Sequence, residues 1–179
     1  MKRILKYTWF FLVMKLSSFM PDFRPLMRFR GFLLRCCFKS CGRNFQICSH
    51  AMIICPSDVS IGNDVYIAYG CWLHGYGGIR LDDEVMLAPY TILVANNHVR
   101  KNSSFRFATA KAAPIVVGRG SWTGSHVTVV AGCTIGAGTA VAAGSVVTRD
   151  LPPDSLCGGI PARVIRSYDS EQDTPEKAL

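Results

Sequence analysis

Aliphatic residues recur at every sixth position along much of the chain, with glycine and small polar residues between them. The repeat is clearest between Val117 and Val147, where the chain divides into five hexads. The fifth position of each of these hexads is small or β-branched. An α-helix repeats every 3.6 residues and a strand every two, so neither element explains this period. Each hexad therefore predicts a short strand and a turn, with its first and fifth side chains pointing inside.

The same period occurs earlier in the chain, in hexads that begin at Ile61, Ile67, Leu81, Leu87 and Leu93. Its phase slips by two residues between Leu73 and Leu81. Stacked coils built from such hexads share one narrow core, as in solenoid proteins. The predicted fold is therefore an all-β solenoid, a parallel β-helix of hexapeptide repeats, over residues 47–166.

One long interruption breaks the repeat, from residue 99 to residue 113. Leu93 and Val117 are four whole hexads apart, so we expect this loop to leave and re-enter the coil without changing its register. The loop carries two aromatic residues and four bases, namely Phe105, Phe107, Arg100, Lys101, Arg106 and Lys111. A loop of this length in a compact domain is usually functional. We expect it to protrude from the β-helix.

The N-terminal segment, residues 1–46, differs in composition from the rest of the chain. Residues 1–50 hold ten Lys and Arg against one acid, Asp22, whereas the remainder carries ten bases and eleven acids. The basic charge therefore belongs to one segment and does not indicate nucleic-acid binding. The apolar run from Ile4 to Met20 is interrupted by lysines and is too short to span a bilayer. No secretory cleavage site follows it, so we expect a cytoplasmic protein with reduced thiols.

Residues 24–39 are compatible with a helix that carries a narrow basic stripe, formed by Arg24, Arg28, Arg35 and Lys39. Two interpretations stay open for this segment. Residues 4–40 make peripheral contact with the inner face of a membrane, or they pack on the end of the β-helix or against partner subunits. Gly31 argues against one continuous helix. The polar, acidic stretch 167–179 predicts a mobile tail.

Eight cysteines raise the question of a metal site. Cys71 and Cys133 occupy the fifth position of their hexads, where a small buried residue is expected. Four others precede His50 without the paired spacing that zinc ligands show. They are Cys36, Cys37, Cys41 and Cys48. We therefore expect partly buried thiols and no metal.

Three motifs follow one another at fixed spacing, namely Ser-Trp-Thr-Gly-Ser from Ser121, Gly-Ser-Val-Val-Thr-Arg-Asp from Gly144, and Pro-Ala-Arg from Pro161. Together with the hexads, residues 58–166 resemble the hexapeptide-repeat acyltransferases, especially the maltose, galactoside and polysaccharide O-acetyltransferases. The resemblance implies a left-handed β-helix, a homotrimer, acetyl-CoA as donor, and an active site between subunits. One departure concerns the acceptor. The sugar acetyltransferases carry an acceptor-site Asn before the catalytic His, and the corresponding stretch 69–76 contains none.

The resemblance also implies roles for single residues. His98, which ends the sequence Ala-Asn-Asn-His, is the expected general base, because an imidazole accepts protons near pH 7. The backbone N–H of Ser125 is the expected oxyanion donor, and Trp122 flanks the donor site. Asn97 and His74 are expected at the acceptor site. The residues expected to contact CoA are Ala143, Gly144, Thr148, Arg149, Arg163 and Arg166, the small ones beside the pantetheine and the arginines beside the phosphates.

The resemblance implies an acetyl-CoA-dependent O-acetyltransferase acting on a saccharide, which we expect to be either a surface polysaccharide or its lipid-linked precursor. The loop 99–113 is expected to fold over a neighbouring subunit's cleft and to help select the acceptor. Two alternatives stay open. One is an N-acetyltransferase acting on an amino sugar, and the other is a catalytically inactive β-helix scaffold.

Overall fold

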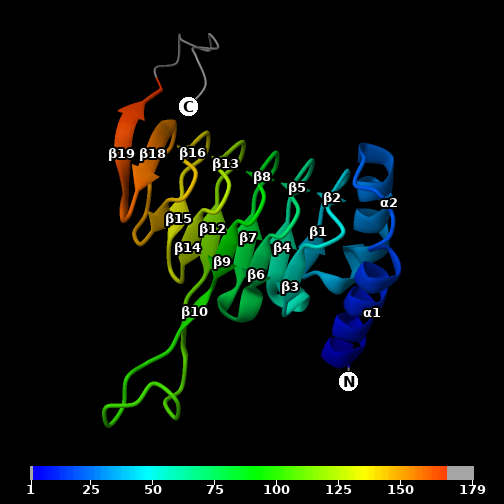
Figure 1. Ribbon diagram of the computed structural model, residues 1–179, viewed down its shortest axis with the longest axis horizontal. Helices are drawn as coiled ribbons and strands as arrows, with labels where there is room; N and C mark the ends of the chain where they lie inside the picture. The colour runs from blue at the N-terminus through cyan, green and yellow to red at the C-terminus, as the bar shows by residue number, and fades with distance from the viewer. Residues whose placement is uncertain (1, 169–179) are drawn as a thin grey trace.

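The computed structural model describes residues 2–168, which form a three-sided parallel β-helix covered at one end by two α-helices (Figure 1). The helices are α1 (Lys2–Leu16) and α2 (Arg24–Leu34), and the short 3-10 turns are η1 (Arg35–Cys37), η2 (Pro56–Asp58) and η3 (Gly75–Gly77). The predicted fold class, a solenoid of hexapeptide repeats with an N-terminal helical segment, is confirmed.

Each side of the β-helix is one sheet, called here A, B or C in the order in which a coil visits them. Sheet A contains β1 (Ser40–Cys41), β4 (Val59–Ile61), β7 (Ile79–Leu81), β12 (Ile115–Val117) and β15 (Thr134–Ile135). Sheet B contains β2 (Gln46–Ile47), β5 (Tyr66–Ile67), β8 (Met86–Leu87), β13 (Trp122–Thr123), β16 (Ala140–Val141) and β18 (Ser155–Gly159), and the antiparallel β19 (Ala162–Ser167) ends it. Sheet C contains β3 (Met52–Ile54), β6 (Trp72–His74), β9 (Ile92–Val94), β14 (Thr128–Val130) and β17 (Val146–Val147).

The long loop leaves the β-helix after sheet C and returns to sheet A (Figure 1). Its two arms pair as β10 (Asn96–Asn97) and β11 (Lys111–Ala112), in an antiparallel ladder. Val117, which follows the loop, pairs with Leu81 in the coil before it and with Ile135 in the coil after it. The loop therefore leaves the register of the coils unchanged, as the hexad count predicts.

The core of the β-helix is a stack of the inward positions of the hexads. Leading residues such as Val117, Ile135 and Val141 are fully buried. The fifth positions are buried as well, and they include polar residues such as Ser121 and Thr139. A buried hydroxyl needs a partner, and Ser121 Oγ donates to the carbonyl of Gly136 at 2.6 Å. The core therefore accepts small polar side chains where the next turn offers a carbonyl.

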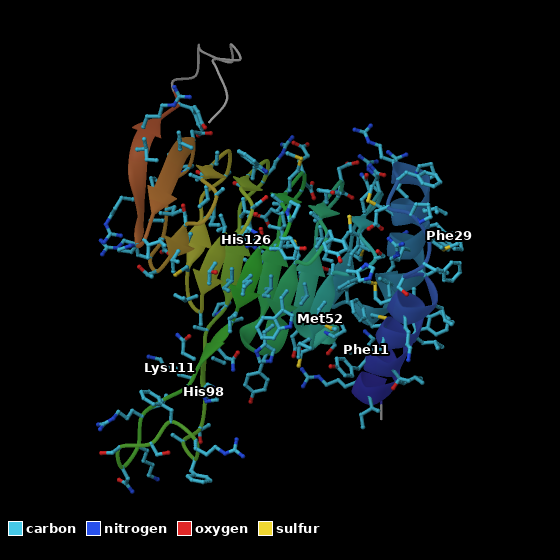
Figure 2. The ribbon with its side chains drawn as sticks, in the orientation of Figure 1. Phe11, Phe29, Met52, His98, Lys111 and His126 are labelled. Atoms are coloured by element: carbon cyan, nitrogen blue, oxygen red, sulfur yellow. The ribbon has the colours of Figure 1, made fainter. Side chains whose placement is uncertain are left out.

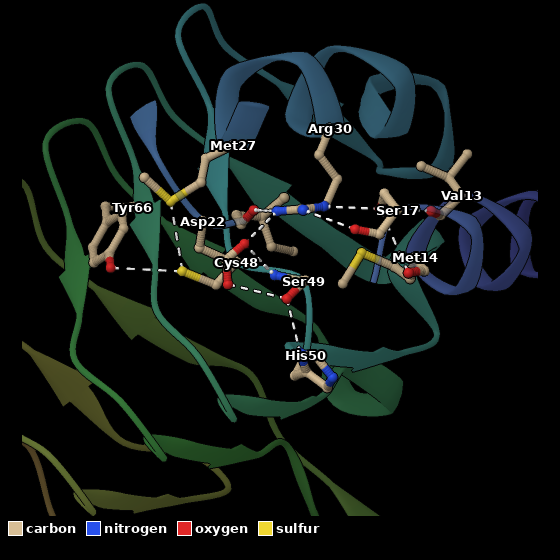
Figure 3. A network of polar contacts seen from close by, with 11 residues as sticks. Val13, Met14, Ser17, Asp22, Met27, Arg30, Cys48, Ser49, His50 and Tyr66 are labelled. Atoms are coloured by element: carbon tan, nitrogen blue, oxygen red, sulfur yellow. Dashed lines mark hydrogen bonds and ion pairs between the residues drawn. The ribbon is translucent and has the colours of Figure 1, made fainter. Parts of the chain in front are cut away.

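Arg30 joins the helical end to the first coil (Figure 3). Its side chain is 1% exposed, and it donates to the hydroxyl and the carbonyl of Ser17, at 2.9 and 3.1 Å. It also donates to Asp22 Oδ1 at 2.8 Å and to the carbonyl of Ile47 at 2.7 Å. Asp22 in turn accepts from the backbone N–H and the hydroxyl of Ser49, at 2.9 and 3.0 Å. One ion pair, between buried Arg30 and partly exposed Asp22, thus connects α2, the turn between the helices, and the β-helix.

Helix α2 passes through Gly31 without a break, which corrects the expectation of an interrupted helix. A Cβ on Gly31 would lie 2.1 Å from the carbonyl oxygen of Phe45. No side chain fits in that space, so glycine lets the helix approach the first coil closely. The helical propensity that glycine lacks is outweighed here by packing.

The helical segment is also shorter than the sequence suggests. Helix α2 ends at Leu34 instead of continuing to Lys39, and a 3-10 turn follows it. The first strand begins at Ser40 and pairs with β4. The β-helix therefore starts before residue 47, because residues 40–41 complete side A of its first coil.

The cysteines are free thiols, and most of them are buried or half-buried. Burial, together with the neighbouring Cys36, raises the pKa of Cys37 to about 12. Burial also raises the pKa of Cys41 and of Cys71 to about 11. Thiols react as thiolates, so burial keeps these residues protonated and unreactive at neutral pH. Within residues 2–168, no group of three or more His, Cys, Asp or Glu is placed to hold a metal ion.

Candidate active site

His98 lies at the neck of the long loop, directly after β10 (Figure 2). The pairing of Asn96 with Ala112 and of Asn97 with Lys111 holds the two arms of this neck together. The residue is exposed, and its ring does not point into the core. The imidazole is therefore accessible to a substrate, and its backbone directly follows a paired strand.

The two residues expected at an acceptor site lie on the same edge as His98, where sheet C meets sheet A. His74 pairs with Val94 of the neighbouring strand, and its carbonyl accepts from the N–H of Ala95 at 3.1 Å. The ring of Trp72 stacks on His74, with centroids 5.9 Å apart and planes 21° apart. Asn97 is exposed beside His98. The structure therefore groups His74, Asn97 and His98 on one edge.

The neighbouring Asn96 is a residue that sequence reasoning missed. Its Oδ1 atom is buried and has no hydrogen-bond partner among the described residues. A buried polar atom without a partner is costly. The sequence carries no signal for this, because Asn96 is one of two adjacent asparagines in a short strand.

Ser125 and the small residues expected beside CoA lie on a different edge, where sheet B meets sheet C. The N–H of Gly144 donates to the carbonyl of Ser125 at 2.9 Å, so their turns are stacked. A Cβ on Gly124 would lie 2.6 Å from the backbone nitrogen of Ala143. Trp122 is half-buried on the adjoining strand, opposite Ala140. These closely stacked turns therefore form an edge that is lined by small residues.

The two edges are separated by the width of sheet C. Figure 2 labels His98 at the loop neck and His126, the residue after Ser125, on the other edge. Three strand residues span about 10 Å, and a turn lies at either end of each strand of sheet C. One protomer therefore does not bring His98 and Ser125 together.

The four residues expected at the nucleotide end of CoA are also divided. Thr148 and Arg149 follow β17 on the edge of His98, and two strand spacings, about 10 Å, separate β17 from β9. Arg163 and Arg166 lie on β19, at the end of sheet B. The guanidinium of Arg166 lies 5.4 Å from the centre of the Tyr168 ring.

A row of four rings in contact with one another follows the edge that carries Ser125, and sequence reasoning missed it. His50 lies 4.9 Å from Tyr69, Tyr69 lies 5.8 Å from Tyr90, and Tyr90 stacks on His126 at 4.9 Å. All four residues are exposed. They occupy the turns between sheets B and C in the first four coils. The signal in the sequence is therefore an aromatic or imidazole side chain at this turn in four successive coils.

Comparison with known proteins shows the family to which the chain belongs. The family model for bacterial transferase hexapeptide (six repeats) matches residues 114–149. The galactoside O-acetyltransferase of Escherichia coli (strain K12) is 30% identical over 137 residues, which cover 76% of this chain and 68% of that protein. The chain belongs to the bacterial hexapeptide-repeat transferase family. A relative from Staphylococcus aureus (strain MRSA252) is 40% identical over 126 residues, and the chain spans 60% of its length.

Two solved structures add ligands to the comparison. A hexapeptide-repeat-containing acetyltransferase from Vibrio cholerae, complexed with acetyl-CoA, is 29% identical to this chain, with a TM-score of 0.74 over 88% of this chain and 84% of that one. A mutant of AntD, an N-acyltransferase from Bacillus cereus complexed with dTDP-4-amino-4,6-dideoxyglucose and coenzyme A, is 25% identical, with a TM-score of 0.60 over 75% of this chain and 86% of that one.

Proposed function

We propose that this hexapeptide-repeat transferase moves an acetyl group from acetyl-CoA to a hydroxyl of a saccharide, with His98 as general base. The observation that carries the proposal is the placement of His98, an exposed imidazole on the paired neck of the loop. The likeness to an acetyltransferase complexed with acetyl-CoA supports the donor. The likeness to the galactoside O-acetyltransferase supports a sugar hydroxyl as acceptor.

The chemistry requires few groups. The imidazole of His98 accepts the proton of the acceptor hydroxyl as its oxygen attacks the thioester carbonyl. The backbone N–H of Ser125 stabilises the negative charge that develops on the carbonyl oxygen. When the tetrahedral intermediate collapses, the C–S bond breaks and the CoA sulfur takes the proton from the imidazolium. The proton is returned within one turnover, so His98 ends neutral.

The donor edge offers room for the pantetheine arm of acetyl-CoA. Gly144 adopts a φ of +71°, and no atom lies within 4 Å of the place where its Cβ would be. Ala143 beside it is exposed. A thin chain can therefore run close to the backbone here, while Arg163 and Arg166 at the end of sheet B, and Arg149 on the His98 edge of the neighbouring protomer, supply planar donors for phosphates.

The separation of the two edges supports a site shared between subunits. Because sheet C separates His98 from Ser125 in one protomer, the proposed reaction needs the His98 edge of one protomer and the Ser125 edge of its neighbour. A homotrimer with head-to-tail contacts provides three such sites. The protruding loop, with Phe107 88% exposed, would then lie over the neighbouring cleft and help select the acceptor.

An amino sugar is the second candidate acceptor, since the AntD structure is that of an N-acyltransferase bound to an amino-sugar nucleotide. Both reactions use the same base and donor. They differ in the product, an ester or an amide.

The carrier of the saccharide is also part of the proposal. The stretch 69–76 lacks an asparagine for a simple sugar, and the N-terminal segment is basic and apolar. Both features favour a lipid-linked saccharide precursor of a surface polysaccharide, at the inner face of the membrane. The protein would then be cytoplasmic and peripheral, with residues 4–40 at the membrane.

The test is to incubate the purified protein with acetyl-CoA and matched pairs of sugars that differ in a hydroxyl or an amino group. We expect CoA release that depends on the acceptor and a product that hydroxylamine cleaves, as it does esters. A product that resists hydroxylamine would identify an amide and favour the alternative. Failure to release CoA with any acceptor would favour the inactive scaffold.

A further inference from the structure

The outer surface of α1 is apolar although nothing in residues 2–168 covers it. Phe10, Val13 and Met14 face inward and are buried. At 100° per residue, Leu5, Leu12 and Leu16 lie on the opposite side of the helix, and they are 71%, 47% and 62% exposed. The helix is therefore apolar on two faces, and only one of them is used to cover the β-helix.

Helix α2 and the turn before it continue this surface. Phe29 and Phe32 are 52% and 65% exposed, and Phe29 points away from the β-helix (Figure 2). Phe19 in the turn is 81% exposed. We name this surface the outer cap face. It consists of Leu5, Trp9, Leu12, Leu16, Phe19, Phe29 and Phe32.

The charge around the outer cap face has one sign. Lys15, Arg24 and Arg28 are exposed, and no described carboxylate pairs with them. The single acid in residues 1–50 is Asp22, which is held by buried Arg30. The surface therefore combines aromatic and aliphatic side chains with uncompensated cations.

The positive charge distinguishes between two possible partners for the outer cap face, a second copy of the chain and a lipid surface. A second copy of the chain, docked cap to cap, would bring two positive surfaces together, which is unfavourable. An anionic lipid surface complements both properties, because the cations meet headgroups while the apolar side chains enter the acyl boundary. None of the described helices is long and apolar enough to cross a membrane, so the contact is peripheral.

The cap lies two coils away from the strand that leads to His98. The two helices lie across the end of the β-helix where β3 belongs to the first coil (Figure 1). β9, which leads to His98, lies two strand spacings beyond β3, or about 10 Å. A hollow of about 440 Å³ opens beside α1, and it is lined by Leu5, Lys6, Trp9 and Cys36. The helical layer adds about another 10 Å between β3 and the outer cap face, so His98 does not lie at the face that binds.

We propose that the outer cap face is a docking surface for an anionic lipid bilayer. Phe29 and Phe32 supply the apolar contact, and Arg24 and Arg28 supply the attraction to anionic headgroups. This deepens the membrane contact of residues 4–40 put forward under the proposed function and rests on that contact, but it does not depend on the acetyl-transfer reaction.

The experiment is cosedimentation of the full chain with vesicles, either of phosphatidylcholine alone or with about 30% phosphatidylglycerol to set the surface charge. We expect binding to the anionic vesicles and little to the neutral ones. The double variant Arg24→Gln/Arg28→Gln should bind at least about tenfold more weakly. The variant Phe29→Ser/Phe32→Ser should also bind at least about tenfold more weakly, because each exposed ring buries apolar surface in the boundary.

The matched control is Arg80→Gln/Arg119→Gln, which removes the same charge from ion-paired residues on side A. It should bind anionic vesicles as the wild type does. Three results would overturn the proposal. The first is that the wild-type protein stays in the supernatant, and the second is that both double arginine variants lose vesicle binding equally. The third is that the protein self-associates through the outer cap face without lipid, as measured by sedimentation velocity. Thermal melting of each variant checks that it is folded, and no result depends on acetyl transfer.

Discussion

Replacement of His98 by glutamine lowers kcat for acetyl transfer by about a hundred- to ten-thousand-fold, the usual contribution of a positioned general base. Glutamine keeps much of the size and polarity of the side chain but cannot take a proton from the acceptor. Because His98 is exposed, the substitution should leave the melting temperature within about 1–2 °C of the wild type. The measurement is steady-state CoA release under saturating acetyl-CoA.

His50→Gln is the control for this prediction. His50 is also exposed and is hydrogen-bonded to Ser49 through Nδ1 at 2.8 Å. It lies on the first coil, away from the loop neck and three strand spacings, about 14 Å, from the coil of Ser125. We expect activity within about twofold of the wild type, as for a surface substitution distant from a site. Full activity in His98→Gln, or equal losses in both variants, would remove His98 from the mechanism.

Replacement of Arg30 by methionine lowers the free energy of unfolding by about 3–5 kcal/mol, the usual cost of breaking a buried charge pair. The variant loses four hydrogen bonds and leaves the carbonyls of Ser17 and Ile47 without this donor. It also leaves the Asp22 carboxylate, only 22% exposed, without its cation. Chemical denaturation followed by circular dichroism would measure the change.

Arg28→Met provides the comparison for Arg30, since Arg28 lies on the same helix and is exposed. Its effect should stay within about 0.5 kcal/mol. Arg30→Lys should resemble Arg30→Met more than the wild type, because one ammonium cannot reproduce the planar set of donors. Equal stability of Arg28→Met and Arg30→Met would show that the buried network does not hold the cap.

The repeating part of the fold follows from local sequence, whereas the helical end does not. A hexad specifies its own strand and turn, so the leading residues Val117 and Ile135 predict where each strand lies. Their spacing from the earlier hexads also predicts that the register is kept across the loop. Arg30 is different. In the sequence it is one of ten bases in the first 50 residues, and its partners at Ser17, Asp22 and Ile47 come from three separate segments. No local pattern distinguishes such a buried arginine from an exposed one.

The candidate site is predictable to a similar, limited extent. Motif spacing singles out His98 and Ser125, but a list of positions does not say that sheet C lies between them. That fact depends on which corner of a coil each residue occupies. The row of rings from His50 to His126 is hidden for the same reason, because its members are far apart in the sequence and meet only when the coils stack.

The most direct test of the account is complementation between two inactive variants. His98→Ala removes the base from one edge, and Ala143→Trp blocks the donor edge with a bulky side chain. If each site combines the His98 edge of one protomer with the Ser125 edge of the next, trimers assembled at random from equal amounts of the two chains recover about a quarter of wild-type activity. About three quarters of these trimers contain both chains, and each mixed trimer has one of its three sites intact. Activity no higher than that of the two variants alone, in trimers shown to contain both chains, would contradict the shared site.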